Sequence, residues 1–386
     1  MVINMCEYNN VPKIRFKGFT DVWEQRKLED ITQIVMGQSP DSINYTDNSD
    51  DTVLIQGNAD LNNGIVVPRI WSSQITKKSY PNDIIFTVRA PVGEIARNPY
   101  FATIGRGVAS FKGNDFLYQS LIQKKENNYW NNISAGSTFD SINSDQLKNV
   151  IIYLPKNNLE QEKIGELFTN LDNLITLHQR KCDNLINVKK SLLEKMFPKN
   201  SSNIPEIRFK GFTDVWEQRK LEETSNRFDN LRVPVSANER EKGTTPYYGA
   251  NGIQDYVKGF THNGEYVLIA EDGANDLKNY PVKYVNGLFW ANNHVHVVQG
   301  KEGICDNKYL KYCFTKTNIE SLLVGGGRAK LNANIMMGIE LTVPSLNEQV
   351  ELGRMFYELD NLITLHQRKL EKLKNIKKSM LEKMFV

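Results

Sequence analysis

The sequence predicts a mixed α/β protein that consists of two tandem α/β domains, each followed by a long helix. Three observations lead to this fold class. A block of twenty residues opens each half of the chain and is nearly identical in both halves. A long amphipathic segment closes each half and contains an identical stretch. The regions in between differ in sequence but repeat the same order of turns and strands. A repeat of this length indicates duplicated domains and not a solenoid of short repeats.

The opening block occupies residues 11–30 (VPKIRFKGFTDVWEQRKLED) and returns at 204–223 (IPEIRFKGFTDVWEQRKLEE). The two copies differ only at positions 11/204, 13/206 and 30/223. Large aromatic side chains are usually buried. We therefore expect Trp23 and Trp216 to anchor a core rather than to stack on nucleic-acid bases.

The two middle regions are predicted to contain corresponding strands. Residues 82–89 (NDIIFTVR) and 264–271 (GEYVLIAE) each read as a turn followed by a buried strand. Residues 108–111 and 294–298 each read as a short strand after a small or polar turn. This comparison places Glu271 where the first region has Arg89.

The end of each middle region also repeats. Residues 136–155 and 325–344 each read as a loop, a short helix and a strand that leads to the long helix. Each middle region is therefore predicted to be a mixed α/β domain with protruding polar loops.

The long helices are predicted from an apolar seam. The stretch LDNLITLHQRK occurs without a mismatch at residues 171–181 and 359–369. Apolar residues recur there at alternating steps of four and three, which is typical of a coiled coil. Because neither helix can bury its seam alone, we expect the two helices to pair. The seam itself does not say whether they run parallel or antiparallel. The residues expected at this interface are Leu171, Ile175, His178 and Leu185, and Leu359, Ile363, His366 and Leu373.

Polar residues interrupt the seam at equivalent places in both helices. A buried polar residue in a coiled coil usually fixes the register, and we favour this role over ligand binding for His178 and His366. For Lys189 and Lys377 we expect the aliphatic stems to pack while the ammonium groups reach solvent.

Composition fits a soluble globular protein. The chain has 386 residues, of which 40% are hydrophobic and 24% charged, and its net charge is only +3. That charge neither requires nor excludes nucleic acid. The four cysteines form no CxxC pair, there is no apolar run long enough for a transmembrane helix, and the N-terminus lacks a secretory signal. We expect a cytoplasmic protein without a membrane partner.

Possible metal and catalytic motifs are weak. Residues two apart on a strand point the same way, so His294 and His296 are expected to face one side, with Cys305 further along. The spacing fits no zinc pattern, and we expect no metal site. His294 is instead a candidate for contact with a base or a phosphate.

Two short sequences resemble catalytic motifs by chance. Residues 98–100 (NPY) lack the second proline of the NPPY-type motif of adenine methyltransferases. Residues 325–328 (GGGR) lack the Lys-Ser/Thr of a phosphate-binding P-loop and read better as a hinged loop. We expect no catalytic residue in this chain.

Nearly the whole chain resembles the specificity subunit of a Type I restriction–modification enzyme. The resemblance rests on the doubled opening block, the doubled helix with its LEKMF ending, GQSP at 37–40 and RAPVG at 89–93. It implies that each middle region is a target recognition domain that reads one half of a split, asymmetric DNA sequence. It also implies that the helices pair as an antiparallel coiled coil with pseudo-twofold symmetry. The domains so delimited are residues 1–156 and 199–345, and the spacer helices are 157–198 and 346–386.

The resemblance also implies partners and cofactors. Two methylation subunits would dock on the repeated parts, and restriction subunits would join them on double-stranded DNA. The assembled complex would be an adenine-N6 DNA methyltransferase and an ATP-dependent endonuclease. This chain would be non-catalytic and hold no cofactor, because S-adenosylmethionine, ATP and Mg would bind to the partner subunits.

Arg, Lys, Asn, Gln and Ser side chains on loops are the usual contacts to phosphates and base edges. In the first domain these candidates are Gln38, Ser39, Lys77, Lys78, Arg89, Arg106, Ser137 and Thr138. In the second domain they are Arg232, Arg240, Lys242, Asn292, Asn293, His294, Arg328 and Lys330.

Two other functions remain open at this point. One middle region would be a nuclease or a methyltransferase in the first alternative, against which the missing cofactor and metal motifs argue. In the second, the chain is a scaffold whose two domains bind proteins or glycans. A DNA affinity that falls steeply with salt would separate a DNA-binding subunit from such a scaffold.

Overall fold

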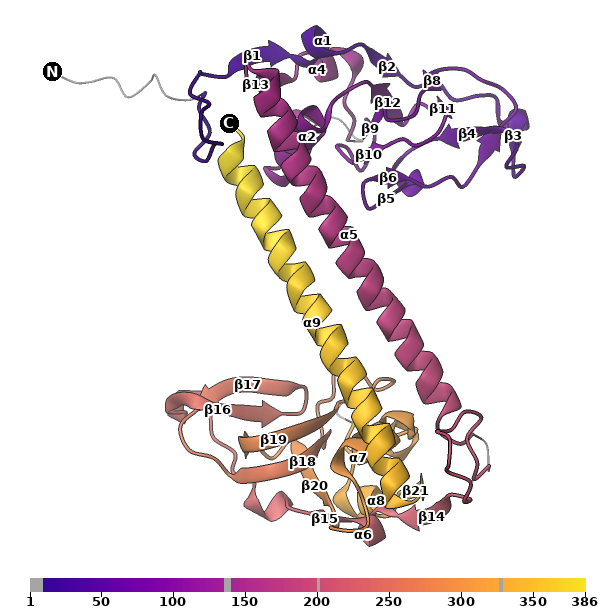
Figure 1. Cartoon of the computed structure of the whole chain (residues 1–386), viewed down its shortest axis with the longest axis vertical. Coiled ribbons are helices and arrows are strands. Elements are labelled where there is room, and N and C mark those ends of the chain that lie inside the picture. Colours follow the sequence, from indigo (N-terminus) through magenta and orange to yellow (C-terminus); the bar gives the residue numbers. More distant parts are fainter. Residues whose placement is uncertain (1–9, 135–139, 200–201, 326–328) are drawn as a thin grey trace, which may run out of the picture. The chain divides into compact units, whose positions relative to one another are not determined.

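The computed structural model describes residues 10–134, 140–199, 202–325 and 329–386 (Figure 1). Its contacts form two compact units. The first unit comprises Met1–Gln179 and Arg368–Val386, and the second comprises Arg180–Gln367. Each unit therefore contains one middle region together with a part of both long helices. In the described ranges, no helix combines the length and apolarity needed to cross a membrane.

The first unit is a mixed α/β domain beside the helices. Its described strands form a six-stranded sheet (order β2-β12-β9-β10-β6-β5), a five-stranded sheet (order β3-β7-β4-β11-β8) and the pair β1-β13. The strands are β1 (Glu24–Lys27), β2 (Ile34–Met36), β3 (Tyr45–Thr46), β4 (Thr52–Ile55), β5 (Leu61–Asn62), β6 (Ile65–Val66), β7 (Trp71–Ser72), β8 (Lys78–Ser79), β9 (Ile84–Thr87), β10 (Ile95–Arg97), β11 (Ala102–Ile104), β12 (Val108–Phe111) and β13 (Ile151–Leu154). The helices are α1 (Leu28–Ile31), α2 (Asp115–Glu126), α3 (Tyr129–Ser134), α4 (Ser144–Lys148) and the first part of α5 (Asn158–Lys195).

The second unit repeats this plan with longer strands. Its described strands form one six-stranded sheet (order β15-β20-β18-β19-β16-β17) and the pair β14-β21. The strands are β14 (Glu217–Lys220), β15 (Ser225–Arg227), β16 (Lys242–Gly249), β17 (Gly252–Val257), β18 (His262–Ala270), β19 (Val282–Ala291), β20 (Val295–Gly300) and β21 (Glu340–Val343). The helices are α6 (Leu221–Thr224), α7 (Asn307–Lys316), α8 (Ala333–Met337) and the first part of α9 (Leu346–Met384). In both units a short helix and a strand precede the long helix, as predicted.

The opening block of each repeat is tied to the start of a long helix. Its strand pairs antiparallel with the strand before that helix, as β1 with β13 and β14 with β21. Arg15 makes two hydrogen bonds to Glu160 of α5, at 2.6 and 2.8 Å. Arg208 makes two to Glu348 of α9, both at 2.7 Å. Both glutamates are buried, so each needs such a bidentate partner to offset the loss of hydration.

The block tryptophans are core anchors, which confirms the prediction. Trp23 and Trp216 are only 2% and 1% exposed. The Trp23 ring lies 5.5 Å from Phe116 and 6.3 Å from Phe385, near the end of the second repeat. In the second unit the ring of Phe197, near the end of the first repeat, lies 6.0 Å from Trp216. Each core is thus closed by an aromatic residue from the other repeat.

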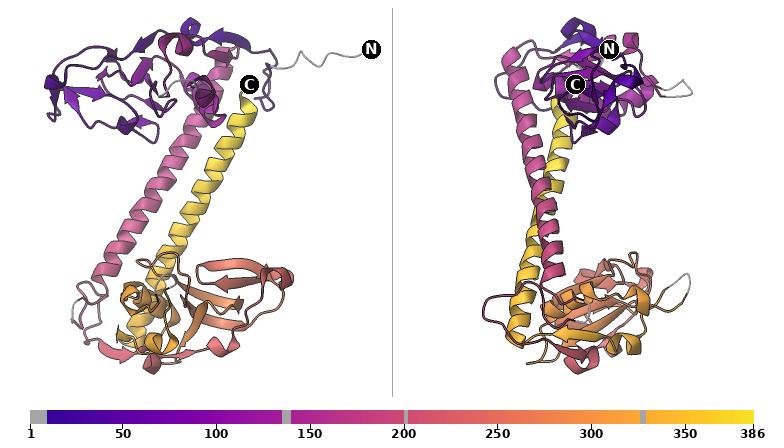
Figure 2. Two further views of the ribbon diagram at one scale, coloured as in Figure 1. Left: turned by 180° about the vertical axis from the view of Figure 1, so that it is seen from behind. Right: turned by 90° about the vertical axis from the view of Figure 1, so that its right-hand side faces the viewer.

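The long helices run antiparallel in the first unit (Figure 2). Phe168 of α5 lies in one core cluster with Leu381 of α9, and one turn further along α5 the carboxylate of Asp172 accepts a hydrogen bond from Lys377 at 2.6 Å. The residue numbers of the contacting pairs rise along α5 while they fall along α9, so the two helices run in opposite directions.

The same direction is found in the second unit. Lys189 of α5 lies 2.5 Å from Asp360, and Phe197, just beyond the end of α5, packs against Phe356, which is earlier in α9. The expectation for the seam lysines was wrong. Lys189 and Lys377 do not extend into solvent but make ion pairs across to the other helix, because an acidic residue faces each of them in the antiparallel register.

In each unit the long helices have a buried or half-buried seam and an exposed outer face. Ile363 is buried, and half-buried positions are Leu171, Ile175, His178, Leu185, Leu359, His366 and Leu373. By contrast, apolar residues of the repeated stretch that lie off the seam are exposed, namely Leu174, Leu177, Leu362 and Leu365.

One glycine in each long helix allows the recognition domain to pack closely. A Cβ atom at Gly165 would lie 2.9 Å from Cβ of Asp115 and 3.0 Å from the amide nitrogen of Phe116, at the start of α2. At Gly353 it would lie 2.7 Å from the amide nitrogen of Tyr309 in α7. These positions are equivalent in the two repeats, so the close approach is a repeated feature.

We predict that Gly353→Ala lowers the free energy of unfolding by about 1–3 kcal/mol, as expected for overpacking. Helix propensity alone would raise it by about 1 kcal/mol, so the sign distinguishes the two effects. Denaturant unfolding measures it. Asn361→Ala, at an exposed position of the same helix, is the control and should not destabilise the protein. A stabilised Gly353→Ala variant would contradict the packing argument.

Candidate nucleic-acid interface

In the first unit, several candidate residues gather at the turn between β11 and β12. The amide of Gln38 donates to the carbonyl of Ile104 at 2.8 Å, and the amide of Arg106 donates to Oγ of Ser39 at 3.3 Å. The amide of Ile104 donates to the carbonyl of Lys77 at 2.9 Å. The structure thus brings together Gln38, Ser39, Lys77 and Arg106, which are far apart in the sequence.

The glycine of the GQSP sequence makes this convergence possible. A Cβ atom at Gly37 would overlap the carbonyl of Gly105 and lie 2.8 Å from that of Val108. The amide of Gly37 also donates to the Val108 carbonyl at 3.0 Å. A larger residue would push the segment that carries Gln38 and Ser39 away from the turn.

Arg89 and Lys78 lie beside this group. The amide of Val88, directly after β9, donates to the carbonyl of Gly107 at 2.9 Å, and Arg89 follows it. Lys77, Lys78, Arg89 and Arg106 are exposed, and none forms a salt bridge with a residue in the described ranges. This face of the first unit is therefore positively charged. Ser137 and Thr138 lie outside the described residues.

In the second unit, four candidates line a hollow of about 290 Å³. They are Arg240, Asn292, Asn293 and His294. The guanidinium of Arg240 lies over the ring of Tyr247 at 4.1 Å and 3.5 Å from a carboxylate oxygen of Asp255, and its Nε donates to the carbonyl of Val235 at 3.1 Å, so its charge is paired within the unit. Asn292 is buried, and its Oδ1 accepts the amide of His294 at 2.8 Å, so it shapes the turn rather than facing solvent. Asn293, at the tip of the turn, and Lys242, at the start of β16, are exposed.

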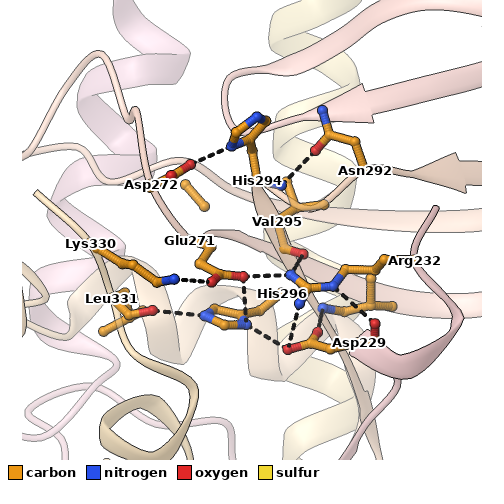
Figure 3. A network of polar contacts seen from close by, with 12 residues as sticks. Asp229, Arg232, Glu271, Asp272, Asn292, His294, Val295, His296, Lys330 and Leu331 are labelled. Atoms are coloured by element: carbon orange, nitrogen blue, oxygen red, sulfur yellow. Dashed lines mark hydrogen bonds and ion pairs between the residues drawn. The ribbon is translucent and has the colours of Figure 1, made fainter. Parts of the chain in front are cut away.

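Arg232 is a correction to the predicted contacts. Its Nη1 lies 2.5 Å from a carboxylate oxygen of Glu271 and donates to the carbonyl of Val295 at 2.8 Å (Figure 3). Its Nε donates to the carbonyl of Asp229 at 3.0 Å. These internal acceptors take up its charge and its donors, so we no longer expect Arg232 to contact DNA.

Lys330 belongs to the same network but lies at its outer edge. Its ammonium group is 2.7 Å from the other carboxylate oxygen of Glu271, while 47% of the side chain remains exposed. It can therefore face both Glu271 and a ligand. Arg328 lies outside the described residues.

The two histidines do not share a side, contrary to the expectation. His296 lies within β20, is 1% exposed and bonds to Asp229 at 2.7 Å through Nδ1. His294 precedes the strand, outside its regular alternation, and its Nδ1 lies 2.5 Å from Asp272 instead (Figure 3). Cys305 packs in the apolar core with neither of them.

The group that could hold a metal ion in the described part of the chain is Asp229, Glu271 and His296. Their ligand atoms lie within 4.8 Å of one another. The cations of Arg232 and Lys330 already lie against these carboxylates, and they would repel a metal ion. The arrangement is better described as an internal ion network. Sequence reasoning missed Asp229 and Glu271 because nothing local marks them as partners of His296.

Both carboxylates of this network are held in their charged form. Burial raises the pKa of Asp229, but the hydrogen bonds from His296 and the Val297 amide, together with the charges of His296 and Arg232, leave the pKa below its ordinary value. Burial likewise raises the pKa of Glu271, but the hydrogen bonds from Lys330 and Arg232, together with the charges of His296 and Arg232, leave the pKa below its ordinary value.

The two units correspond residue by residue at this face, which corrects one alignment. The amide of Ile142 donates to the carbonyl of Val88 at 2.9 Å, and the amide of Leu331 donates to that of Glu271 at 2.7 Å. Glu271 therefore stands where the first unit has Val88, not Arg89. The counterpart of Arg89, which bridges to Ser141, is Asp272, which bridges to Lys330.

The NPY sequence has a structural role. The Nδ2 of Asn98, which is fully buried, donates to Oγ of Ser79 at 2.9 Å and to the carbonyl of Tyr100 at 2.8 Å. Its Oδ1 accepts the amide of Tyr100 at 3.0 Å. Both polar atoms of the side chain thus bond inside the domain, to the turn that reaches Tyr100 and to Ser79 in β8.

Comparison with known proteins identifies the family. Residues 20–187 and 213–375 each match the family described as "Type I restriction modification DNA specificity domain". The chain belongs to this family. The two matches together cover most of the chain and fall one on each repeat, in agreement with the duplication and the mixed α/β fold.

Several members of this family are similar to the chain. A Haemophilus influenzae protein named as a type I restriction enzyme specificity subunit is 44% identical over 167 residues, which are 43% of this chain and 42% of the relative. This match therefore spans less than half of either protein. The type I restriction enzyme MjaIX specificity subunit of Methanocaldococcus jannaschii is 25% identical over 338 residues, 78% of this chain and 77% of the relative.

A solved structure shares the fold. The S subunit of a Type-I restriction-modification system from M. genitalium superposes with a TM-score of 0.70. The match covers 97% of this chain and 99% of that chain at 16% identity.

We predict that acid destabilises the second unit through Asp229 and Glu271. Because their folded pKa values are lowered, their contribution to stability is complete above about pH 5 and is lost as the pH falls through those values. Glu271→Gln should therefore flatten the decrease in the free energy of unfolding between about pH 5 and pH 3, measured by urea unfolding. Glu302→Gln, at an exposed position, should keep the wild-type slope. An unchanged slope in Glu271→Gln would contradict the role of the network.

Proposed function

We propose that this chain is the sequence-specific DNA-binding subunit of a Type I restriction–modification complex, in which each unit reads one half of a split target. The observation that carries this proposal is the convergence of polar candidates at one equivalent turn of each unit. The turn precedes β12 in the first unit and β20 in the second, and its residues differ completely between the units. Equivalent scaffolds with different contact residues suit two different half-sites.

The chemistry of the two faces supports DNA as the ligand. The exposed cations of the first unit suit phosphates, and the asparagine turn of the second suits base edges. Asn293 and Lys330 are exposed, and buried Asn292 shapes the turn that carries Asn293. A scaffold that binds proteins or glycans, the alternative, gives no reason for the exposed cations that gather beside this turn in the first unit.

We further propose that two copies of a methylation subunit dock on the repeated surfaces. Leu174 and Leu177 are 44% and 46% exposed in the first unit, and Leu362 and Leu365 are 45% and 46% exposed in the second. The same apolar surface is thus present twice, off the helix seam. Identical surfaces suit identical partners, and large exposed apolar residues at rigid helices are typical of interfaces.

The chemistry of the complex is proposed for the partners. We assign S-adenosylmethionine and adenine-N6 methylation to the methylation subunits, and ATP, Mg and DNA cleavage to restriction subunits. The role of this chain is to choose the DNA sequence on which they act.

The test of the proposed function is a single-molecule methylome of a methylase-deficient host that carries this chain with its methylation subunit. We predict a new split motif with one methylated adenine on each strand. Exchange of residues 199–345 for another recognition domain should change one half of the motif only. No methylation while the methylation subunit is bound would contradict the proposal, and salt-insensitive or absent DNA affinity would favour the scaffold.

The docking surfaces are tested by subunit stoichiometry. We predict that the double variant Leu174→Ser, Leu177→Ser binds one methylation subunit at least about tenfold more weakly. Burial of two leucine side chains contributes about 3–6 kcal/mol to the free energy of binding. Native mass spectrometry should then show one bound subunit instead of two. Ile43→Ser, at a 90% exposed site away from the helices, is the control. Retention of two subunits in the double variant would contradict this surface.

A further inference from the structure

The ion network of the second unit contacts the bridged pair Val324 and Lys330 through Lys330. Val324 and Lys330 exchange two backbone hydrogen bonds, each of 2.9 Å, and we call this pair the loop base. Lys330 also bridges to Asp272. The loop base therefore lies beside the segment that follows β18.

Two side chains bind the residues at the loop base. Glu271 binds the ammonium group of Lys330 at 2.7 Å. Nε2 of His296 lies 2.8 Å from the carbonyl of Leu331, and its Nδ1 lies 2.7 Å from Asp229 (Figure 3). Both partners of His296 are acceptors only, so both hydrogen bonds form when both ring nitrogens carry a proton. Leu331 is fully buried, which fixes the chain immediately after Lys330.

At the equivalent positions the first unit has no charged residues. Glu271 corresponds to Val88, and Leu331 corresponds to Ile142, from the equivalent backbone hydrogen bonds. The amide of Glu271 donates to the carbonyl of His294 as the amide of Val88 donates to that of Gly107, both at 2.9 Å. Counting two residues on from Gly107 and His294, His296 corresponds to Ala109. Val88, Ala109 and Ile142 are all buried and apolar.

An apolar core is thus sufficient to fold this part of the domain. Replacement of buried ion pairs by apolar residues is often neutral for stability, so stability alone does not account for the network. The charged groups add a defined position for the loop base, because Glu271 and His296 bind specific atoms of Lys330 and Leu331. The loop base lies beside His294, since Asp272 contacts His294 through its side chain and Lys330 through its backbone.

We infer that Glu271 and His296 are positioning residues that fix the loop base, and with it Lys330, at the face where the second unit reads its half-site. This inference rests on the proposed function. Neither residue needs to touch DNA, since His296 is buried and Glu271 acts through Lys330.

The test measures affinity for DNA duplexes with the complex of this chain and its methylation subunit. One duplex carries the intact target, one a substitution in the half-site assigned to the second unit, and one a substitution in the other half-site. We expect Glu271→Gln to reduce discrimination at the second half-site at least about tenfold, the scale of one lost base contact. Discrimination at the first half-site should stay within about twofold and shows that the assembly is intact.

The sign of the change in DNA affinity distinguishes a loss of Lys330 positioning from the electrostatic effect of removing one negative charge. Removal of a negative charge should tighten DNA binding through electrostatics alone. Glu302→Gln, an exposed carboxylate of the same unit, gives this baseline. Weaker binding by Glu271→Gln against that baseline supports positioning, and equal or tighter binding with unchanged discrimination overturns it.

A second variant covers a failure of Glu271→Gln to fold. Glu271→Val together with His296→Ala places the residues of the first unit at this site. Denaturant unfolding shows that the variant folds, and the folded variant should lose discrimination at the second half-site. Retained discrimination in this folded variant overturns the inference. A wild-type complex without any sequence preference would instead refute the proposed function.

Discussion

The whole structure depends on how the two opening-block tryptophans are buried. Trp23 packs on Phe116 of its own domain and on Phe385, near the end of the second repeat. Trp216 packs on Tyr309 of its own domain and on Phe197, near the end of the first repeat. Because each block core needs an aromatic residue from the other repeat, neither repeat can complete its core alone. The antiparallel direction of the helices in each unit satisfies this requirement.

This constraint explains which parts of the chain remain alike. Residues of the opening block contact residues of the long helices in both units. A substitution in the block therefore requires a compensating substitution in the helix that it contacts. The glycines at 165 and 353 extend this coupling to the domains, since each admits the first turn of a domain helix. The turns before β12 and β20 lie outside these contacts and are free to differ. Under the proposed function, this divergence is what would let one architecture read two different half-sites.

Sequence reasoning predicted the repeated elements well and their long-range polar contacts poorly. The strands around Phe86 and Leu268, the long helices and the buried tryptophans follow from local periodicity and apolar content. The pairing of Glu271 with Arg89 failed by one residue, and in a strand such a shift exchanges the two faces. The partners of His296 could not be found, because Asp229 is 67 residues away and no local pattern links them. The cross-helix pairs of Lys189 and Lys377 depend on the direction of the helices, which the seam does not encode.

The closure of the first core by Phe385 also sets an order of events during synthesis. Trp23 and Phe116 leave the ribosome early, but the aromatic ring that completes their cluster is made only after all of the second unit. Until then the first unit exposes the apolar surface of Ile164 and Phe168. Contacts between such distant positions form slowly, because a long segment of chain must be ordered first. The first unit therefore completes its core only after the second unit is made, whereas the second unit receives Phe197 before its own domain is made.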